Sequence, residues 1–172
     1  NMLAYERSWN RQINKMEIFY DFHIHSALSP CGDNDMTPNN IVNMAMIKGL
    51  DFIAVSDHNS AKNIPAIAKC AQAAGIGFLP GIELNTAEEV HLLGYFLDAD
   101  TAFEFGEVVY EALPNVKNMP DFFGNQYIMD ENDEIVGEVD KLLISALPWS
   151  FDESVKKIIK YGGIAVPAHI NK

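Results

Sequence analysis

Short apolar runs alternate with helix-forming segments along most of this 172-residue chain. The apolar runs predict strands over residues 15–22, 52–56, 77–82, 90–96 and 164–167. The segments between them predict helices over residues 38–48, 61–74, 99–113 and 151–161. Strands that alternate with helices favour a largely parallel α/β sheet or barrel, in which chemistry gathers at the carboxyl ends of the strands.

Capping residues mark the limits of two predicted helices. Thr37 is a suitable N-cap, Pro38 suits the first helical position and Gly49 suits the stop. Ser150 is the expected N-cap of the last helix, which carries acidic residues in its first turn and lysines late. Those charges complement the helix dipole.

Size and composition indicate one globular domain, with 48% hydrophobic and 21% charged residues. No apolar run approaches the roughly 20 residues of a membrane span. Cys31 and Cys70 lie in unlike contexts and give no disulfide framework, so we expect a cytoplasmic protein. A formal charge of −12 disfavours stable nucleic-acid binding, because a polyanion is repelled by such a surface.

Two regions depart from the alternation. Residues 1–15 read as a polar N-terminal extension, and residues 114–147 as an insertion with a β-hairpin over 127–136. We expect the insertion to lie beside the site as a lid, a specificity element or a subunit contact, which would allow a homo-oligomer. The chain stops at Lys172, directly after a predicted strand, so we expect the C-terminal part of the domain to be missing.

All five histidines lie near the ends of predicted strands, or early in a strand for His91. His23 and His25 are two apart and therefore project from one face of their strand. Glu83 leaves a buried strand, where a carboxylate needs a partner. Histidine with carboxylate suits zinc, manganese or iron, and a bridging carboxylate can hold two cations about 3.5–4 Å apart. The sequence therefore predicts a metal centre.

Five motifs carry these residues in a fixed order, and together they are specific. The chain resembles the polymerase and histidinol phosphatase (PHP) family over nearly its whole length, apart from the first fifteen or so residues and the insertion. The matching motifs are His23-Ile24-His25-Ser26, Ser56-Asp57-His58-Asn59, Gly81-Ile82-Glu83, His91-Leu92-Leu93-Gly94-Tyr95 and Ala168-His169.

The resemblance implies a distorted (β/α)7 barrel with a trinuclear centre in a cleft at one end. By position, the first metal would be bound by His23, His25 and Glu83. Glu83 would bridge to a second metal, completed by His91 and His169. The family supplies two further ligands from a late Asp-x-His, and no such motif follows His169. Either this chain is a fragment or two of the metal sites each lack a ligand.

The resemblance assigns the third metal to Asp33 and His58. Asp35 lies two residues further along the same loop and could substitute for Asp33. Cys31 lies between His25 and Asp33 and could bind a metal as thiolate, although a turn residue without that role is the commoner case.

The family's chemistry is the hydrolysis of phosphate esters, so the resemblance implies a metal-dependent phosphoesterase acting on a small phosphorylated metabolite or nucleotide. Glu83 and His169 would be catalytic, Glu83 by bridging the metals and His169 by assisting the leaving group. Asp57 would orient His58 or a metal-bound water, although an aspartate after a strand is also typical of a helix N-cap. Two alternatives stay open: a nuclease acting on short oligonucleotides and a non-catalytic metal-binding PHP domain.

Substrate phosphates also need partners outside the metals. Lys172 stands where many relatives carry an arginine, and Lys62 is a second candidate. Each lysine could instead be a solvated surface charge. Ser26 and Asn59 would line the pocket.

Overall fold

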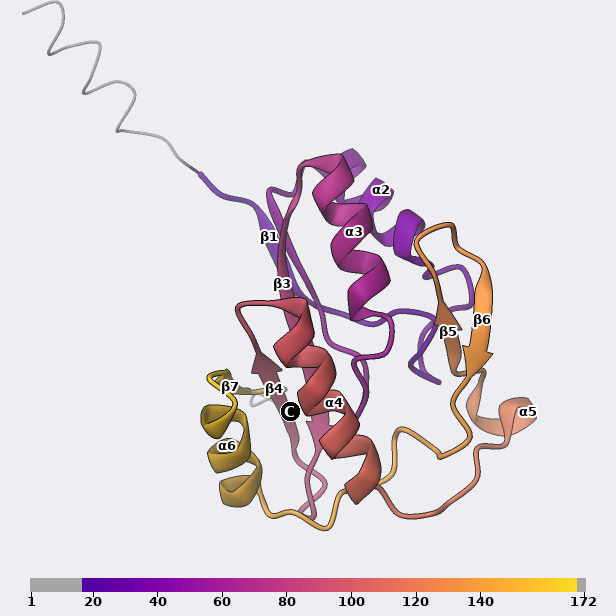
Figure 1. Cartoon of the computed structure of the whole chain (residues 1–172), viewed down its shortest axis with the longest axis vertical. Helices are drawn as coiled ribbons and strands as arrows, with labels where there is room; N and C mark the ends of the chain where they lie inside the picture. The colour runs from indigo at the N-terminus through magenta and orange to yellow at the C-terminus, as the bar shows by residue number, and fades with distance from the viewer. Residues whose placement is uncertain (1–16, 170–172) are drawn as a thin grey trace, which may run out of the picture.

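The computed structural model describes residues 17–169, which form a five-stranded sheet with helices packed against it (Figure 1). The strand order is β1-β2-β3-β4-β7, and β5 and β6 form a separate hairpin. In chain order the elements are β1 (Tyr20–Ile24), α2 (Pro38–Lys48), β2 (Phe52–Val55), α3 (Ile64–Ala74), β3 (Gly77–Asn85), β4 (His91–Tyr95), α4 (Ala99–Ala112), α5 (Pro120–Phe123), β5 (Tyr127–Met129), β6 (Ile135–Glu138), α6 (Phe151–Lys160) and β7 (Ile164–Pro167).

The sheet is mixed. Strands β1, β2 and β3 are parallel, whereas β4 is antiparallel to both β3 and β7. The α/β class is confirmed, but a parallel β4 is excluded because only residues 86–90 separate it from β3. A parallel connection needs about a dozen residues or more. Over residues 17–169 the sheet is open, so the closed (β/α)7 barrel is not seen in this part of the chain.

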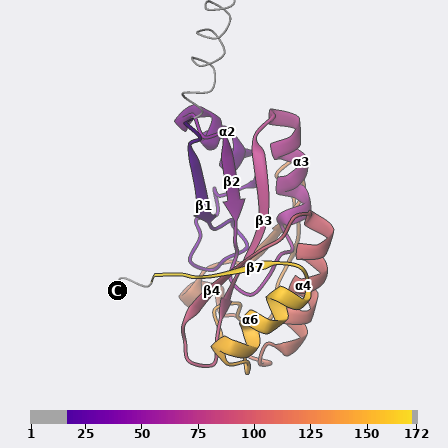
Figure 2. The ribbon, with the colours of Figure 1, turned by 90° about the vertical axis from the view of Figure 1, so that its left-hand side faces the viewer.

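The two faces of the sheet have different neighbours. Ile53 and Val55 face the main core, which also contains buried side chains of α2, α3, α4 and α6. Ala54 and Leu93 belong to a second, smaller cluster. Because alternate residues of a strand point to opposite faces, the second cluster marks the face away from the helices. Figure 2 shows α3, α4 and α6 on one side of the strands.

The predicted helix caps are confirmed. Thr37 accepts a hydrogen bond from the N–H of Asn40, Gly49 adopts the left-handed conformation that ends α2, and Ser150 and Glu153 form a capping box. The helix predicted from residue 61 begins three residues later, at Ile64. The strand predicted over 77–82 continues to Asn85, because its last residues pair with β4. The first predicted strand is observed from Tyr20 to Ile24, and residues 15 and 16 lie outside the described range.

The hairpin predicted within residues 114–147 is present as β5 and β6. It packs on the helical layer: the N–H of Asn39 donates to Asp133 at 2.9 Å, and Lys69 pairs with Glu131 at 2.9 Å. Asn63 accepts from the N–H of Met129. Among the described helices, none combines the length and the hydrophobicity that crossing a membrane requires.

Replacing Gly106 by alanine should destabilise the protein. At an exposed position inside a helix, the same replacement typically stabilises the helix by about 1 kcal/mol. The added Cβ would lie 2.8 Å from Cβ and 2.9 Å from the backbone nitrogen of Ala61. We expect a loss of about 1–3 kcal/mol in the free energy of unfolding, measured with urea. Gly137→Ala is the control, because its Cβ would approach nothing closer than 3.5 Å. A Gly106→Ala protein as stable as the wild type would contradict the close contact between α4 and Ala61.

Candidate metal centre

One buried glutamate lies within reach of all five histidines. Glu83 is fully buried, and its Oε2 lies 3.1 Å from Nε2 of His23, 3.2 Å from Nε2 of His25 and 3.4 Å from Nδ1 of His58. Its Oε1 lies 3.0 Å from Nδ1 of His91 and 3.7 Å from Nε2 of His169. The two carboxylate oxygens therefore face different sets of imidazoles. Six of the seven residues predicted as metal ligands are therefore brought together, and Asp33 is not among them.

The cluster forms where the carboxyl ends of β2 and β3 meet the start of the antiparallel strand β4. Glu83 lies in β3, and an isolated parallel bridge joins it to His58 in the loop after β2. His91 is the first residue of β4, and its antiparallel direction brings that start to the carboxyl end of β3. The N–H of Ala168 donates to the carbonyl of His91 at 3.0 Å, which places His169 beside the cluster.

The imidazoles surround Glu83 in close contact with one another. The rings of His25 and His58 stack with centroids 4.6 Å apart, and those of His23 and His169 lie 5.1 Å apart. Exposure rises across the cluster, from 8% for the side chain of His58 to 43% for that of His169. The centre is therefore closed at His58 and open to solvent at His169.

Burial and neighbouring charges shift the proton equilibria of the centre. Burial lowers the pKa of His58 to about 4 and outweighs the attraction of Glu83, so this imidazole is neutral near pH 7. For Glu83, burial acts to raise the pKa, but His23, His25 and His58 outweigh it and hold that pKa far below its ordinary value. Near neutral pH the centre therefore offers a carboxylate and a neutral imidazole, which are the forms that bind metal ions.

A buried carboxylate fixes the loop that carries His25. Asp57 Oδ1 accepts from the N–H of Ser26 at 2.7 Å and from the hydroxyl of Ser29 at 2.8 Å, and Oδ2 accepts from the hydroxyl of Ser26 at 2.6 Å. Burial acts to raise the pKa of Asp57, while the Ser26 hydrogen bonds and the nearby His25 act to lower it. The next helix has Asn63 as its N-cap. Asp57 is therefore no helix cap, and its hydrogen bonds lead through Ser29 to the ring of His25 rather than to the imidazole of His58.

Ser29 determines which nitrogen of His25 carries a proton. Its hydroxyl donates its one hydrogen to Asp57 and accepts from the N–H of His58 at 3.0 Å. Its remaining lone pair accepts from Nδ1 of His25, which lies 3.2 Å away. Nε2 of the neutral His25 is then an unprotonated nitrogen 3.2 Å from Glu83 Oε2. Two such electron-rich atoms repel each other unless a cation or a proton lies between them.

The pKa of His25 reflects the same need for positive charge. Burial acts to lower that pKa. The hydrogen bond to Glu83 and the negative charges of Asp57 and Glu83 act to raise it, and together they outweigh burial. The net shift is upward, so a proton can take the place between His25 and Glu83. A metal ion bound there would displace that proton.

Several buried polar atoms around Glu83 have no hydrogen-bond partner within residues 17–169. His23 Nε2, His58 Nδ1 and Glu83 Oε2 are all of this kind. Unsatisfied buried polar atoms are rare in native proteins, and an ion is one of their ordinary explanations. Three groups of residues each offer ligand atoms that lie within 4.8 Å of one another. The groups, or ligand sets, are His23, Glu83 and His169; His58, Glu83 and His91; and His25, Cys31 and His58. The residues present therefore fit divalent cations.

The two predicted aspartates lie at the edge of the centre. Asp33 accepts the N–H of Asp35 at 2.9 Å, and both are exposed. Neither belongs to the three ligand sets found among the described residues, whereas Cys31 does. Sequence reasoning ranked Cys31 below Asp33, because spacing along a loop does not tell which side chain turns inward.

The predicted substrate residues are placed differently. Ser26 and Asn59 are fully buried, and Asn59 donates to the carbonyls of Leu143 and Ser145. These contacts give Ser26 and Asn59 a structural role. Lys62 forms an ion pair with Glu107, and Lys172 lies outside the described residues.

A cavity of about 940 Å³ adjoins the centre. Its lining includes His23, His25, Cys31, Asp33 and Asp35. Pockets for small ligands are typically about 300–1,000 Å³, so this cavity is large enough for a phosphorylated metabolite or a nucleotide.

Asp57→Asn should destabilise the protein by about 1.5–3 kcal/mol, the range for hydrogen bonds to a charged group. The lone pairs of Ser26 Oγ are already taken by the N–H of Leu28 and the side chain of Asn63, so an amide at Oδ2 would face a group that cannot accept its hydrogen. Urea unfolding of the variant measures this. Asp140→Asn is the exposed control and should change the free energy of unfolding by less than about 0.5 kcal/mol. Equal losses in both variants would contradict the network.

Zinc or manganese at 100 times its Kd should raise the free energy of unfolding by about 2.7 kcal/mol, because binding to the native state stabilises it. Thermal unfolding with and without a chelator measures the effect. Glu83→Gln should lower it markedly, since the variant loses the carboxylate shared by two of the three ligand sets and keeps only the set of His25, Cys31 and His58 intact. Glu138→Gln, on an exposed position of the hairpin, should keep it. Retention of the full effect by Glu83→Gln would refute a metal centre at Glu83.

Curated relatives match about half of this chain. A 5′-3′ exoribonuclease, Rnm, of Salmonella typhimurium is 29% identical over 86 residues, which cover 47% of this chain and 28% of that protein. A 3′,5′-nucleoside bisphosphate phosphatase of Chromobacterium violaceum is 30% identical over 81 residues, or 45% of this chain and 27% of that protein. The matched segment thus spans less than a third of either relative.

Solved structures share the fold over most of the chain. A proposed metal-dependent phosphoesterase of Bifidobacterium adolescentis matches with a TM-score of 0.60 and 19% identity, covering 89% of this chain and 67% of that one. The lesion-specific endonuclease EndoQ of Pyrococcus furiosus matches with a TM-score of 0.58 and 21% identity, covering 88% of this chain and 34% of that one.

The family model of the PHP domain matches residues 21–163, which include Glu83 and four of the five histidines around it and leave out only His169. The chain therefore belongs to the PHP domain family.

Proposed function

We propose that this chain hydrolyses phosphoester bonds of a small phosphorylated metabolite or nucleotide at a centre of two or three divalent cations. The observation that carries the proposal is the buried carboxylate of Glu83 within 3.0–3.7 Å of a nitrogen of every histidine in the chain. Family membership supports it. Zinc, manganese and iron are the candidate metals, since each accepts imidazole and carboxylate ligands.

Glu83 is the residue that would join the cations. Its Oε2 faces His23, His25 and His58, and its Oε1 faces His91 and His169. This division suits a bridging carboxylate with separate imidazole sets on its two oxygens. Bound divalent cations would supply Lewis-acid activation of the phosphoryl group and of a water molecule.

The histidines of the centre are of two kinds: some are buried or fixed by hydrogen bonds, and others are partly exposed to solvent. His58 is nearly buried and His25 is fixed through Ser29 and Asp57, so both hold a rigid geometry. His91 and His169 are the most exposed of the five, at 33% and 43%. We propose that the scissile phosphate lies on their side, that the rest of the substrate reaches towards the cavity lined by His23 and His25, and that His169 assists the leaving group. Asp57 acts as a positioning residue for His25.

Substrate recognition would rest on few basic groups. Lys62 is engaged by Glu107, so Lys172 is the lysine retained as a candidate phosphate partner from the sequence. The formal charge of −12 favours a compact anion that the cations can neutralise over a long polyanion.

Two relatives support nucleotides as the proposed substrate class. One is named for acting on nucleoside 3′,5′-bisphosphates and another for degrading RNA from its 5′ end. We therefore place phosphorylated nucleosides first, with short oligonucleotides as the alternative. Metal binding without turnover would assign the chain to the non-catalytic class.

The protein loaded with manganese, zinc or iron should release phosphate from a nucleoside 3′,5′-bisphosphate or p-nitrophenyl phosphate, measured by a phosphate assay. His25→Ala should lower kcat/KM by at least about 10–100-fold, because that loss is typical even when a group that only orients a metal ligand is removed. Lys69→Ala, on the exposed ion pair with the hairpin, is the control and should keep the activity.

A 5′-phosphorylated RNA trinucleotide distinguishes the alternative. Faster turnover of the trinucleotide than of the mononucleotide at low salt would favour the nuclease. Inactivity of all three metal forms on every substrate, with metal bound, would sink the hydrolase proposal.

A further inference from the structure

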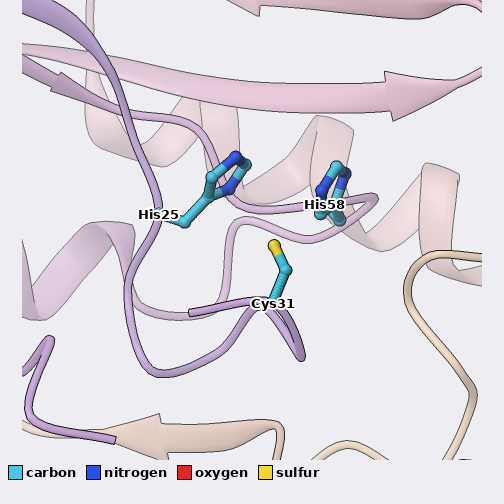
Figure 3. Close-up of side chains that lie close together, drawn as sticks. All are labelled: His25, Cys31 and His58. Atoms are coloured by element: carbon cyan, nitrogen blue, oxygen red, sulfur yellow. The ribbon is translucent and has the colours of Figure 1, made fainter. Parts of the chain in front are cut away.

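The thiol of Cys31 lies beside His25 and His58, where the sequence predicted the carboxylate of Asp33. The Sγ of Cys31 and one ring nitrogen each of His25 and His58 all lie within 4.8 Å of one another. Figure 3 shows the three side chains converging from the loop after β1, from the end of β1 and from the loop after β2. Cys31 and His25 also line the cavity that adjoins the centre.

The loop that carries Cys31 is fixed at several points. Ser29 binds Asp57, and the N–H of Gly32 donates to the carbonyl of Ser29 at 2.8 Å. A Cβ on Gly32 would lie only 2.4 Å from the carbonyl oxygen of Ser26, so this tight turn requires glycine. Gly124 packs on the other side, where a Cβ would lie 2.3 Å from the carbonyl oxygen of Pro30. The position of Cys31 is therefore set by its neighbours.

His58 gives a second observation that the cluster of imidazoles takes a cation. Its side chain is 8% exposed, and its Nδ1, which lies 3.4 Å from Oε2 of Glu83, has no hydrogen-bond partner among the described residues. Its neighbours Glu83 and His25 also need positive charge between them. A cation bound by the imidazoles would satisfy these groups together.

The separations suit a tetrahedral ion. Zinc binds thiolate at about 2.3 Å and imidazole at about 2.0–2.1 Å, so ligand atoms of one zinc lie about 3.3–3.8 Å apart. The ligand atoms of Cys31, His25 and His58 lie within 4.8 Å of one another, so small side-chain rotations would bring them to the separations of a zinc site. The exposed Cys31 can make such a rotation more easily than a buried side chain can.

We propose that Cys31 binds one cation of the centre as a thiolate, together with His25 and His58. This proposal rests on the metal centre of the proposed function and specifies its third position. Thiolate is a soft ligand that favours zinc, iron and cobalt over manganese and magnesium, so Cys31 also biases the metal preference of the protein. Neither Asp33, whose Oδ1 accepts from the backbone N–H of Asp35, nor Asp35 belongs to a ligand set among the described residues.

Cobalt substitution tests the proposal without reference to activity. The chain contains only two cysteines, Cys31 and the buried Cys70, so a thiolate signal has one alternative source. Cobalt-loaded protein should show a near-ultraviolet thiolate-to-cobalt charge-transfer band in addition to the visible bands of bound cobalt. The band should vanish in Cys31→Ser and persist in Cys70→Ser.

Competition experiments measure the metal preference. Cys31→Ser should lower the affinity for zinc about 10–100-fold, the range for disturbing a metal's ligand shell. Cys31→Asp should shift the zinc-to-manganese preference towards manganese, because a carboxylate oxygen replaces the thiolate. Far-ultraviolet circular dichroism checks that both variants are folded, and Cys70→Ser should keep the wild-type preference.

The outcomes separate the two proposals. Bound cobalt with visible bands but no charge-transfer band, or a band that persists in Cys31→Ser, would overturn the role of Cys31 alone. Failure to bind cobalt, zinc or manganese at all would overturn both this proposal and the metal centre of the proposed function.

Discussion

The rest of the site depends on the burial of one negative charge. The carboxylate of Glu83 is wholly removed from water, and an isolated ionised carboxylate is very costly to bury. Five imidazoles surround it, and three of them, His23, His25 and His58, hold it in the ionised form. Imidazoles that are neutral cannot neutralise it, and protonated ones would repel one another at ring separations of 4.6–5.7 Å. Cations relieve both problems, which is why the arrangement fits a metal centre.

The position of Glu83 on the sheet explains how a buried carboxylate can be accommodated there. Ile82 and Leu84 lie in the main core, so Glu83 between them points to the face away from the helices. Its burial comes from the histidines and the strand ends around it rather than from a helix. The same geometry leaves His91 and His169 partly open, and a substrate can approach from there.

Support for the centre comes from segments that contribute no ligand. Asp57 and Ser29 orient His25, and Asn59 adopts a positive φ of 47° next to His58. A non-glycine residue in this conformation is held by its surroundings. Here the holding contacts are the carbonyls of Leu143 and Ser145, which belong to the segment 114–147. That segment therefore acts on the centre through the backbone of His58, and its hairpin packs on the helices.

The sequence by itself determined the strands, most helix limits and the six residues of the cluster, because apolar periodicity, capping residues and histidine spacing are local signals. Tertiary structure decided the direction of β4, the open sheet over residues 17–169 and the approach of Cys31 to His25 and His58. It also gave Ser26, Asn59 and Lys62 partners that draw them away from a substrate. These outcomes depend on pairing and packing between distant segments, and no local pattern records which side chain a neighbouring element will meet.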